Sequence, residues 1–421
     1  AKLQNYNGRF CESEYENTFI AFLEQEGWQY LPGKRIARSS QRDVLYIDDL
    51  EQFLSNTNPD LTVDEIRQLM DTVRLIGADS DFATLHKVYG WMVNGIQFTP
   101  QDGLSRMVAL LDFEHPESNI FRVVNQFTVE YVNNGITENR RPDVLLFVNG
   151  LPLCVVELKN PSDAQATIYE AWEQINIRYW RDIPHLLHYC PLACISDGVK
   201  TRLGTVRTPY EHFYAWRRVN DNDAVSTLPF EETKAMIGGV YSPKRFLEIF
   251  RDYIYFQDSV YDSDEREIVC RYPQFFAARL LKQSIVRSVI DKSGKGGTYF
   301  GATGCGKTYT MAFLARQLSL RCTDVPQIGS PTIILIVDRD ELQKQGAKLF
   351  TKSKEFLNLG EVSVVPNRQK LREELGARAS GGFYICTIQK FCDREDDKIG
   401  LINDRANIIC FSDEAHRTQL E

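Results

Sequence analysis

The chain has 421 residues, of which 43% are hydrophobic and 25% charged, and it carries a formal net charge of −8. This composition is ordinary for globular protein in two or three domains, and the charge excludes a small basic nucleic-acid-binding domain. A large enzyme with one basic groove is not excluded, because nucleic-acid binding depends on local charge. No apolar run approaches the ~20 residues that span a bilayer, and the N-terminus has no apolar signal core. We therefore expect a cytoplasmic protein without a membrane partner.

The ten cysteines are scattered along the chain, and none of them forms a C-x-x-C pair. The closest pair, Cys190 and Cys194, lies in an apolar stretch. This usage is typical of reduced core thiols, and it argues against a zinc site because no second ligand pair has suitable spacing.

The first predicted element is an amphipathic helix in residues 11–30. Ser13 could cap it with Glu16 as the capping-box acid, and Gly27 could end it. Residues 43–112 have mainly helical spacing and carry no recognisable chemistry. We expect them to form a helical insertion that packs or positions a domain.

Two strands joined by a tight turn follow in residues 141–159. Both are nearly continuous in apolar residues, which indicates strands covered on both faces, and Asn149-Gly150 between them is a strong hairpin signal. The polar residues at the strand ends are therefore conspicuous: Asp143, Glu157 and Lys159. Residues 121–129 predict a further strand.

The register of this hairpin decides whether Asp143 and Glu157 meet. A two-residue Asn149-Gly150 loop sets Asp143 opposite Val156, so that Glu157 points to the other face. A three-residue loop or one β-bulge sets Asp143 opposite Glu157. If these residues form a functional site, we therefore expect a hairpin loop with an odd number of residues, or a β-bulge.

Two carboxylates and a lysine at one strand end suit metal-dependent phosphodiester hydrolysis. Asp143, Glu157 and the backbone carbonyl of Leu158 would hold Mg²⁺, which lowers the pKa of a bound water. Lys159 would position that water or stabilise charge on the phosphorane. The alternative is a salt bridge at a sheet end. The Pro142-Asp143…Glu157-Leu158-Lys159 pattern resembles that of the PD-(D/E)xK nuclease superfamily.

That resemblance implies two further site residues. An acid on the first helix often supplies another metal contact, and Glu16 matches best, with Glu14 as runner-up and a helix-cap role as the alternative. Some members carry Gln-x-x-x-Tyr on the helix after the lysine strand. Gln174 aligns as a candidate DNA contact, but Tyr179 lies five residues on, so the tyrosine stays open; the literal pair, Gln165 and Tyr169, lies too early.

Residues 192–218 combine a further strand and turn with a mixed basic and aromatic stretch. Lys200, Arg202 and Arg207 alternate with aromatics such as Tyr210 and Tyr214. This mixture suits contact with a DNA backbone, or surface charge over a packed aromatic core. Polar and acidic breaks then place a linker or interface segment at 219–264.

Residues 301–308 fit the phosphate-loop pattern G-x-x-x-x-G-K-[ST] without a mismatch. The loop backbone would cradle phosphates, Lys307 would reach the β- and γ-phosphates, and Thr308 would hold Mg²⁺. We expect a strand at 298–300 before the loop and a helix from about Gly306 after it. The alternative is a glycine-rich turn that binds nothing. The candidate nucleotide-binding residues of the loop are Gly301, Thr303, Gly304, Cys305, Gly306, Lys307 and Thr308.

Gln274 precedes the phosphate loop in a position that resembles the adenine-reading Q motif of superfamily 2 helicases. Its side-chain amide offers both a donor and an acceptor to adenine, which makes ATP the expected nucleotide. An isolated glutamine would carry no such meaning.

Apolar strands at 332–337, 383–386 and 408–411 alternate with helices and end in polar residues, which predicts a parallel doubly wound sheet. Asp413-Glu414-Ala415-His416 follows the last strand. Asp413 would bind Mg²⁺ with Thr308, Glu414 would polarise the attacking water, and His416 would couple the nucleotide and nucleic-acid sites. By resemblance to helicase motifs Ia and Ib, the candidate DNA contacts are Arg339, Gln345, Thr387 and Lys390, with loop stabilisation as the alternative for each.

The order of the two parts, a nuclease and then a superfamily 2 motor, resembles the restriction and translocation subunit of bacterial and archaeal type I restriction–modification enzymes. The resemblance implies an α/β chain: a PD-(D/E)xK fold in 1–218, with a mixed sheet flanked by helices, and a RecA-like domain in 265–421. It also implies ATP and Mg²⁺ as cofactors, double-stranded DNA as substrate, and modification and specificity subunits as partners. Because the second RecA-like domain is missing, we expect a fragment with little coupled ATPase activity. Two alternatives remain open: a DNA remodeller with an inactive nuclease-like clamp, and an ATP-gated assembly scaffold.

Overall fold

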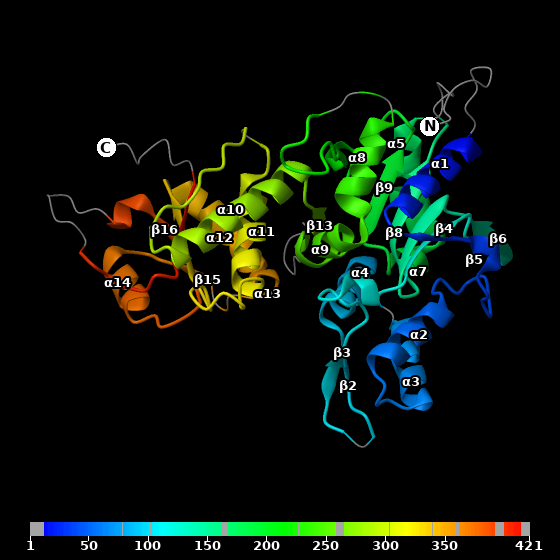
Figure 1. Cartoon of the computed structure of the whole chain (residues 1–421), viewed down its shortest axis with the longest axis horizontal. Helices are drawn as coiled ribbons and strands as arrows, with labels where there is room; N and C mark the ends of the chain where they lie inside the picture. The colour runs from blue at the N-terminus through cyan, green and yellow to red at the C-terminus, as the bar shows by residue number, and fades with distance from the viewer. Residues whose placement is uncertain are drawn as a thin grey trace. The chain divides into compact units, whose positions relative to one another are not determined.

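The computed structural model describes residues 12–77, 79–101, 103–160, 167–225, 228, 230–257, 265–302, 304–338, 340–358, 360, 362–391 and 400–413. The chain divides into two compact units (Figure 1). The first comprises Ala1–Ile254 with Arg266–Arg271, and the second comprises Tyr255–Glu265 with Tyr272–Glu421. Among the described residues, no helix combines the length and hydrophobicity needed to cross a membrane.

A seven-stranded mixed sheet in the order β1-β4-β7-β8-β9-β10-β11 is the centre of the first unit. β1 runs parallel to β4 and β8 parallel to β9, whereas β4–β7, β7–β8, β9–β10 and β10–β11 are antiparallel. Every residue of β7, β8 and β9 is buried, as expected for central strands covered on both faces. The strands are β1 (Gln29–Pro32), β4 (Phe121–Asn125), β7 (Val144–Val148), β8 (Leu151–Leu158), β9 (Leu192–Ser196), β10 (Thr201–Thr205) and β11 (Tyr214–Ala215).

Helices flank this sheet. α1 (Glu12–Gln25) packs against β1, β4 and β8, and α5 (Ile168–Glu173) packs against β8 and β9. α5 continues directly into a π-helix, η3 (Gln174–Tyr179), and then into α6 (Trp180–Asp182) and α7 (Pro184–Leu187). Short 3-10 turns are η1 (Gly33–Arg35), η2 (Pro116–Ser118) and η4 (Tyr210–His212).

The start of α1 differs from the expected capping box. Ser13 lies inside the helix, and the Glu16 side chain accepts hydrogen bonds from Asn125 and Gln126 instead of returning to a cap. Glu16 is therefore directed to the end of β4, where these two amides are its partners. The end of the helix is as predicted, since Gly27 has a φ of 110°.

The segment expected as a linker, 219–264, contributes helices to the first unit. α8 (Glu231–Met236), the π-helix η5 (Ile237–Tyr241) and α9 (Pro243–Asp252) bury Tyr241, Phe246 and Phe250 completely. β12 (Ile254–Gln257) and β13 (Arg266–Val269) follow where the chain passes from one unit to the next.

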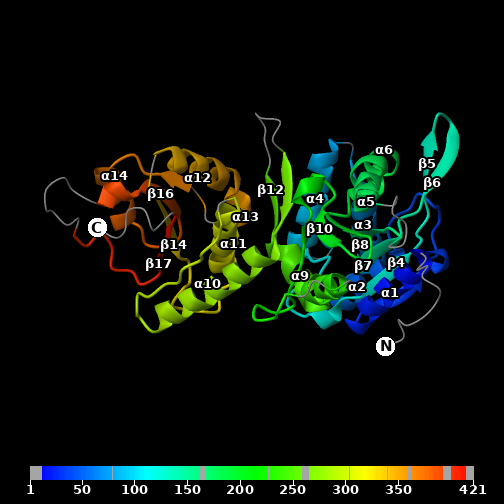
Figure 2. The ribbon, with the colours of Figure 1, turned by 90° about the horizontal axis from the view of Figure 1, so that it is seen from above.

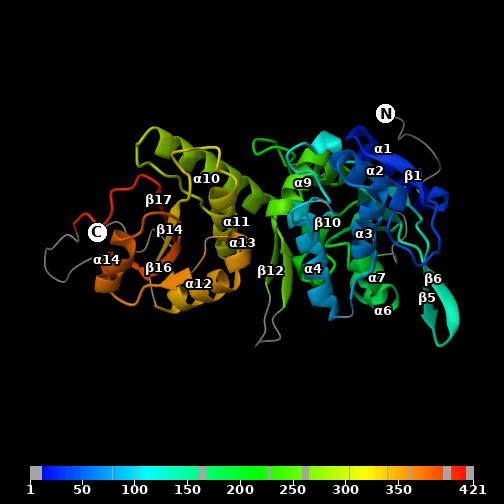
Figure 3. The ribbon, with the colours of Figure 1, turned by 90° about the horizontal axis from the view of Figure 1, so that it is seen from below.

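The expected helical insertion at 43–112 forms α2 (Ile47–Thr57), α3 (Val63–Arg74) and α4 (Asp81–Asn94), and it ends in the β2–β3 ribbon (Ile96–Phe98 and Arg106–Val108). A second ribbon, β5–β6 (Val129–Asn133 and Ile136–Arg140), extends from the unit beside the large sheet (Figures 2 and 3). Its turn contains Asn134 and Gly135, with φ values of 49° and 79°. This is the left-handed geometry that Asn-Gly hairpin turns favour.

The second unit contains a four-stranded, all-parallel sheet in the order β15-β16-β14-β17, as a RecA-like domain requires. Its strands are β14 (Thr332–Val337), β15 (Val362–Val364), β16 (Phe383–Thr387) and β17 (Ile408–Ser412). Its helices are α10 (Tyr272–Ile290), α11 (Lys307–Leu320), α12 (Asp340–Lys352), α13 (Lys354–Leu357) and α14 (Arg368–Gly376), with the 3-10 turn η6 (Ile388–Phe391).

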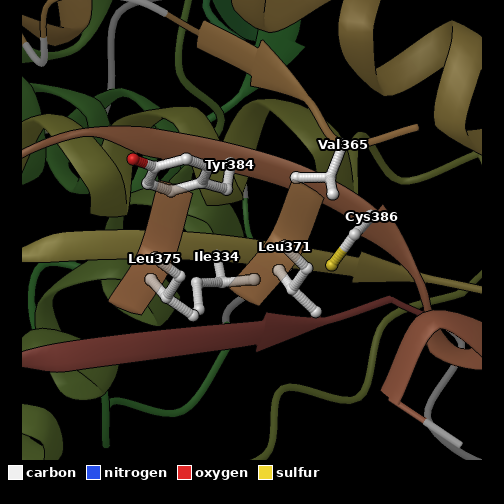
Figure 4. Close-up of a cluster of buried hydrophobic side chains, with 6 residues drawn as sticks. All are labelled: Ile334, Val365, Leu371, Leu375, Tyr384 and Cys386. Carbon is white, nitrogen blue, oxygen red and sulfur yellow. The ribbon is translucent and has the colours of Figure 1, made fainter. Parts of the chain in front are cut away.

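Part of the core of this unit lies between the sheet and α14. Figure 4 shows Ile334, Tyr384 and Cys386 of the sheet gathered with Val365, Leu371 and Leu375, all of them buried. The strand expected at 298–300, before the phosphate loop, is not formed. Phe300 is 95% exposed, so its side chain gains nothing from packing that would hold a short strand in place.

Candidate functional site

The β7–β8 hairpin has the irregularity that a functional site predicts. Asn149 and Gly150 form the turn with positive φ values of 51° and 78°, and Val148 pairs with Leu151. Moving away from the turn, the register shifts at a bulge between Leu146 and Phe147. Beyond this bulge, Val144 pairs with Val156. The bulge sets Asp143 and Glu157, the next residue of each strand, opposite each other.

The side chains of Asp143 and Glu157 meet at this strand end. The Leu158 N–H donates to Asp143 Oδ2 at 2.9 Å, and the Asp143 N–H donates to Glu157 Oε1 at 3.4 Å. Both side chains are buried, with Glu157 fully enclosed. The two carboxylates are therefore held beside the backbone of Leu158, whose carbonyl was the third expected metal ligand.

Glu157 lies in an environment that opposes its negative charge. Burial raises its pKa well above the usual value, and the nearby Asp143 carboxylate raises it further, while Tyr179 and Lys159 act in the opposite direction. Its Oε2 atom is buried and has no hydrogen-bond partner among the described residues. An orphaned, enclosed carboxylate oxygen of this kind fits a site built for a cation.

Lys159 is connected to Glu157 through a chain of side chains. Lys159 Nζ donates to Gln174 Oε1 at 3.2 Å, and Gln174 Nε2 donates to the Tyr179 hydroxyl at 2.9 Å. Tyr179 in turn donates to Glu157 Oε1 at 2.6 Å. Gln174, expected as a candidate DNA contact, is thus an internal partner of Lys159, and Tyr179 is the tyrosine that sequence spacing left open.

Glu16 reaches the same region from α1. Asn125 and Gln126, at the end of β4, each donate a 2.6 Å hydrogen bond to one oxygen of its carboxylate. Gln126 Nε2 also lies 3.4 Å from Asp143 Oδ1. Burial raises the pKa of Glu16, and these two amides lower it. Sequence reasoning missed Asn125 and Gln126, although a polar pair at the end of an apolar strand was a visible signal.

A network of buried hydroxyls lies behind the site. Tyr15, the neighbour of Glu16, has its hydroxyl 2.6 Å from Ser196 Oγ and 3.2 Å from Thr233 Oγ1. The Ser196 carbonyl accepts the Lys159 N–H at 2.8 Å. The network ties the helix that carries Glu16 to the strand end that carries Lys159, and no sequence motif marked it.

Within the described residues, no group of three or more His, Cys, Asp and Glu side chains is already arranged to hold a metal ion. The donor set nevertheless fits a divalent cation. Hard oxygen ligands are present in Asp143 and Glu157, and one of these oxygens is buried without a partner.

The phosphate loop of the second unit leads into a helix as predicted. α11 begins at Lys307, with Gly306 as N-cap at a φ of 81° and Gly304 at 79°. Thr308 lies in the first turn of this helix, where backbone N–H groups and the helix dipole favour phosphate. Gln274 is buried, and its Nε2 donates to the Gly306 carbonyl at 3.0 Å. Gln274 therefore supports the loop directly.

Asp413 follows β17 at the carboxyl end of the sheet, and its N–H donates to the Ile336 carbonyl at 2.9 Å. Thr387 ends β16 and is buried. Lys390 Nζ donates to the Val365 carbonyl, a contact that favours its loop-stabilising alternative. Thr303, Arg339, Glu414 and His416 lie outside the described residues, as does the side chain of Gln345.

The two units thus define a class of protein: a chain with a carboxylate site on a mixed sheet, followed by a phosphate loop on a parallel sheet. Residues 9–212 match the family described as type I restriction enzyme R protein N terminus, and residues 273–421 match the SWI2/SNF2 ATPase family. The chain belongs to the family of type I restriction enzyme R proteins, and it corresponds to their N-terminal portion.

Relatives from distant organisms agree. The type I restriction enzyme HindI endonuclease subunit of Haemophilus influenzae is 30% identical over 97% of this chain and 39% of its own length. The putative type I restriction enzyme MjaIXP endonuclease subunit of Methanocaldococcus jannaschii is 28% identical over 96% of this chain and 39% of its own. The type I restriction enzyme SauCOLORF180P endonuclease subunit of Staphylococcus aureus is 25% identical over 97% of this chain and 40% of its own length. The chain therefore spans about two fifths of the length of these relatives.

Proposed function

We propose that the chain is the nuclease and first motor portion of a type I restriction subunit that cuts double-stranded DNA in a reaction driven by ATP. The observation that carries this proposal is the bulged β7–β8 hairpin, which sets Asp143 opposite Glu157 beside Lys159. A surface salt bridge at a sheet end would need neither the bulge nor the burial of both acids.

In this proposal, Asp143, Glu157 and the Leu158 carbonyl hold Mg²⁺ as hard oxygen ligands. When bound, Mg²⁺ would supply Lewis-acid polarisation of the phosphate and a lowered pKa for a bound water. Tyr179 donates to Glu157 and favours its ionised, metal-binding form. Gln174 holds Lys159 at the strand end, where its ammonium group stabilises charge that develops on the phosphate.

The second unit supplies one side of an ATPase site. Lys307 and the N–H groups at the start of α11 contact the phosphates, and Thr308 and Asp413 hold the magnesium ion of the nucleotide. Glu414 orients the attacking water, and His416 couples the site to DNA. Arg339, Gln345 and Thr387 remain candidate contacts to the DNA backbone, whereas the contact of Lys390 with the Val365 carbonyl favours a loop-stabilising role. Partner modification and specificity subunits would supply recognition of the target.

The test is DNA cleavage by the full-length chain in its complex, supplied with Mg²⁺ and ATP. Glu157→Ala and Lys159→Ala should each lower cleavage at least a hundredfold and leave DNA-stimulated ATP hydrolysis within twofold. Glu173→Ala is the matched control, because this carboxylate lies next to Gln174 in sequence but has no role in the proposed site. Full cleavage by Glu157→Ala would favour an inactive nuclease-like clamp instead.

A further inference from the structure

The side chain of Gln126 lies between two acids of the candidate metal site. Its Nε2 atom donates to Glu16 Oε2 at 2.6 Å and lies 3.4 Å from Asp143 Oδ1. A carboxamide nitrogen has two N–H donors, and here they face two carboxylates. The partially positive NH₂ group therefore occupies the position between the acids that a shared cation would take.

The backbone holds Gln126 in this position. Its φ is 51°, a left-handed conformation that is uncommon and strained for residues other than glycine. The Gln126 N–H donates to the Asp143 carbonyl at 3.0 Å, which fixes the turn against the strand that carries Asp143. Asn125 completes the arrangement by donating to the other oxygen of Glu16 at 2.6 Å.

The acids around this amide are not yet a metal site. No three carboxylates of the described residues are arranged for one ion, although Glu157 Oε2 is buried without a partner. Mg²⁺ needs oxygen atoms at about 2.1 Å, closer than an amide requires. The carboxylates must therefore draw together, and the Gln126 amide must leave, before one ion can contact both Glu16 and Asp143.

We propose that Gln126 is an internal substitute for a divalent cation at the Glu16–Asp143 pair, and that the ion displaces its carboxamide when it binds. Gln126 then sets the affinity of the nuclease site for metal and keeps the acids separated in the metal-free protein. This inference rests on the proposed nuclease function, because Asp143 belongs to the metal site of that proposal and Glu16 is added to it as a further ligand.

The experiment measures Mn²⁺ binding to the full-length protein, without DNA or nucleotide, from the electron paramagnetic resonance signal of free Mn²⁺. Gln126→Gly keeps the left-handed backbone and removes the amide, so it should bind Mn²⁺ about tenfold more tightly. Gln126→Glu keeps the side-chain length and should also bind more tightly, because it replaces the donor by a ligand. In the double variant Gln126→Gly/Glu16→Gln, the gain should disappear.

Asn134→Gly is the matched control, since Asn134 has a φ of 49° at the exposed tip of the β5–β6 ribbon. It relieves the same kind of backbone strain away from the site and should leave Mn²⁺ affinity unchanged. Affinity within twofold of the wild type in both Gln126 variants would overturn the inference, as would a gain that survives Glu16→Gln. Because the readout is metal binding, it is independent of whether Glu157→Ala abolishes cleavage.

Discussion

Gln174 donates a 2.9 Å hydrogen bond to the hydroxyl of Tyr179, although the two residues lie five positions apart in one helix. In an α-helix, side chains with this separation point about 140° apart. The segment from Gln174 to Tyr179 is a π-helix, whose wider turn brings the two onto one face. The extra residue in this turn therefore explains why the tyrosine departs from the Gln-x-x-x-Tyr spacing that the sequence resemblance led us to expect.

We predict that Tyr179→Phe shifts the pH dependence of DNA cleavage. The Tyr179 hydroxyl stabilises ionised Glu157, so its removal raises the pKa of that carboxyl further above its usual value. Since metal binding needs the ionised form, the acidic limb of the rate profile should move to higher pH. At pH 7 the rate should fall roughly tenfold, the effect of losing one charge-assisted hydrogen bond. Cleavage rates from pH 6 to 9 measure the shift.

Tyr169→Phe serves as the control for this experiment, because Tyr169 lies on the same run of helix but is 44% exposed. Its profile should match the wild type. A Tyr179→Phe profile that drops uniformly at every pH would contradict the electrostatic role and leave only a packing role for the tyrosine.

The hairpin geometry was predictable because Asp143 can lie opposite either Val156 or Glu157. Only the pairing with Glu157 brings the two carboxylates together. The bulge before Phe147 confirms that prediction. The position of Tyr179 was not predictable, since a π-turn has no clear sequence signature. The strand at 298–300 and the Ser13–Glu16 capping box were both wrong. In each case the tertiary structure, and not the local sequence pattern, decided the outcome. Phe300 is exposed and has no packing to hold a strand, and the Glu16 side chain bonds to amides that lie far away in sequence.

Deletion of Ile177 should convert the π-turn into a continuous α-helix. Ile177 is 48% exposed, so its loss removes little core packing. The tyrosine would then lie four residues after Gln174, and its hydrogen bonds to Gln174 and Glu157 should survive. We expect DNA cleavage within about threefold of the wild type and an unchanged unfolding temperature. Insertion of one alanine after Ile177 is the opposite change and should abolish cleavage; equal activity of the two variants would disprove the geometric account.

Glu267 should make the first unit less stable as the pH rises. This residue is buried, and neither carboxylate oxygen has a partner among the described residues, while Thr205 bonds to its backbone carbonyl instead. Burial raises the pKa of Glu267 well above its usual value. Above about pH 4.3, the unfolded chain loses this proton and the folded chain retains it, so folding loses free energy until the folded-state pKa is reached.

Glu267→Gln removes this titration and keeps the shape of the side chain. The variant should therefore gain stability relative to the wild type as the pH rises from 4.5 to 8, measured by thermal unfolding. Glu265→Gln is an exposed control nearby in the sequence and should show no such trend. A stability difference that is constant across this pH range would show that Glu267 is not protonated in the folded protein.

Gln274 links nucleotide choice to the shape of the phosphate loop. Its amide nitrogen donates to the Gly306 carbonyl at 3.0 Å, directly before the first residue of α11. Gln274→Ala should remove one donor from that carbonyl, which keeps the helical Thr310 N–H at 3.2 Å, and so loosen the loop. The KM for ATP should therefore rise up to about tenfold, the upper effect of losing a buried hydrogen bond of ~1.4 kcal/mol. If the side chain also reads adenine, the KM for ATP should rise more than the KM for GTP. Steady-state ATPase and GTPase rates of the full-length protein on DNA measure both effects.

Gln369→Ala, an exposed glutamine on α14, is the control. Unchanged KM values for both nucleotides would rule out any role of Gln274 in the nucleotide site.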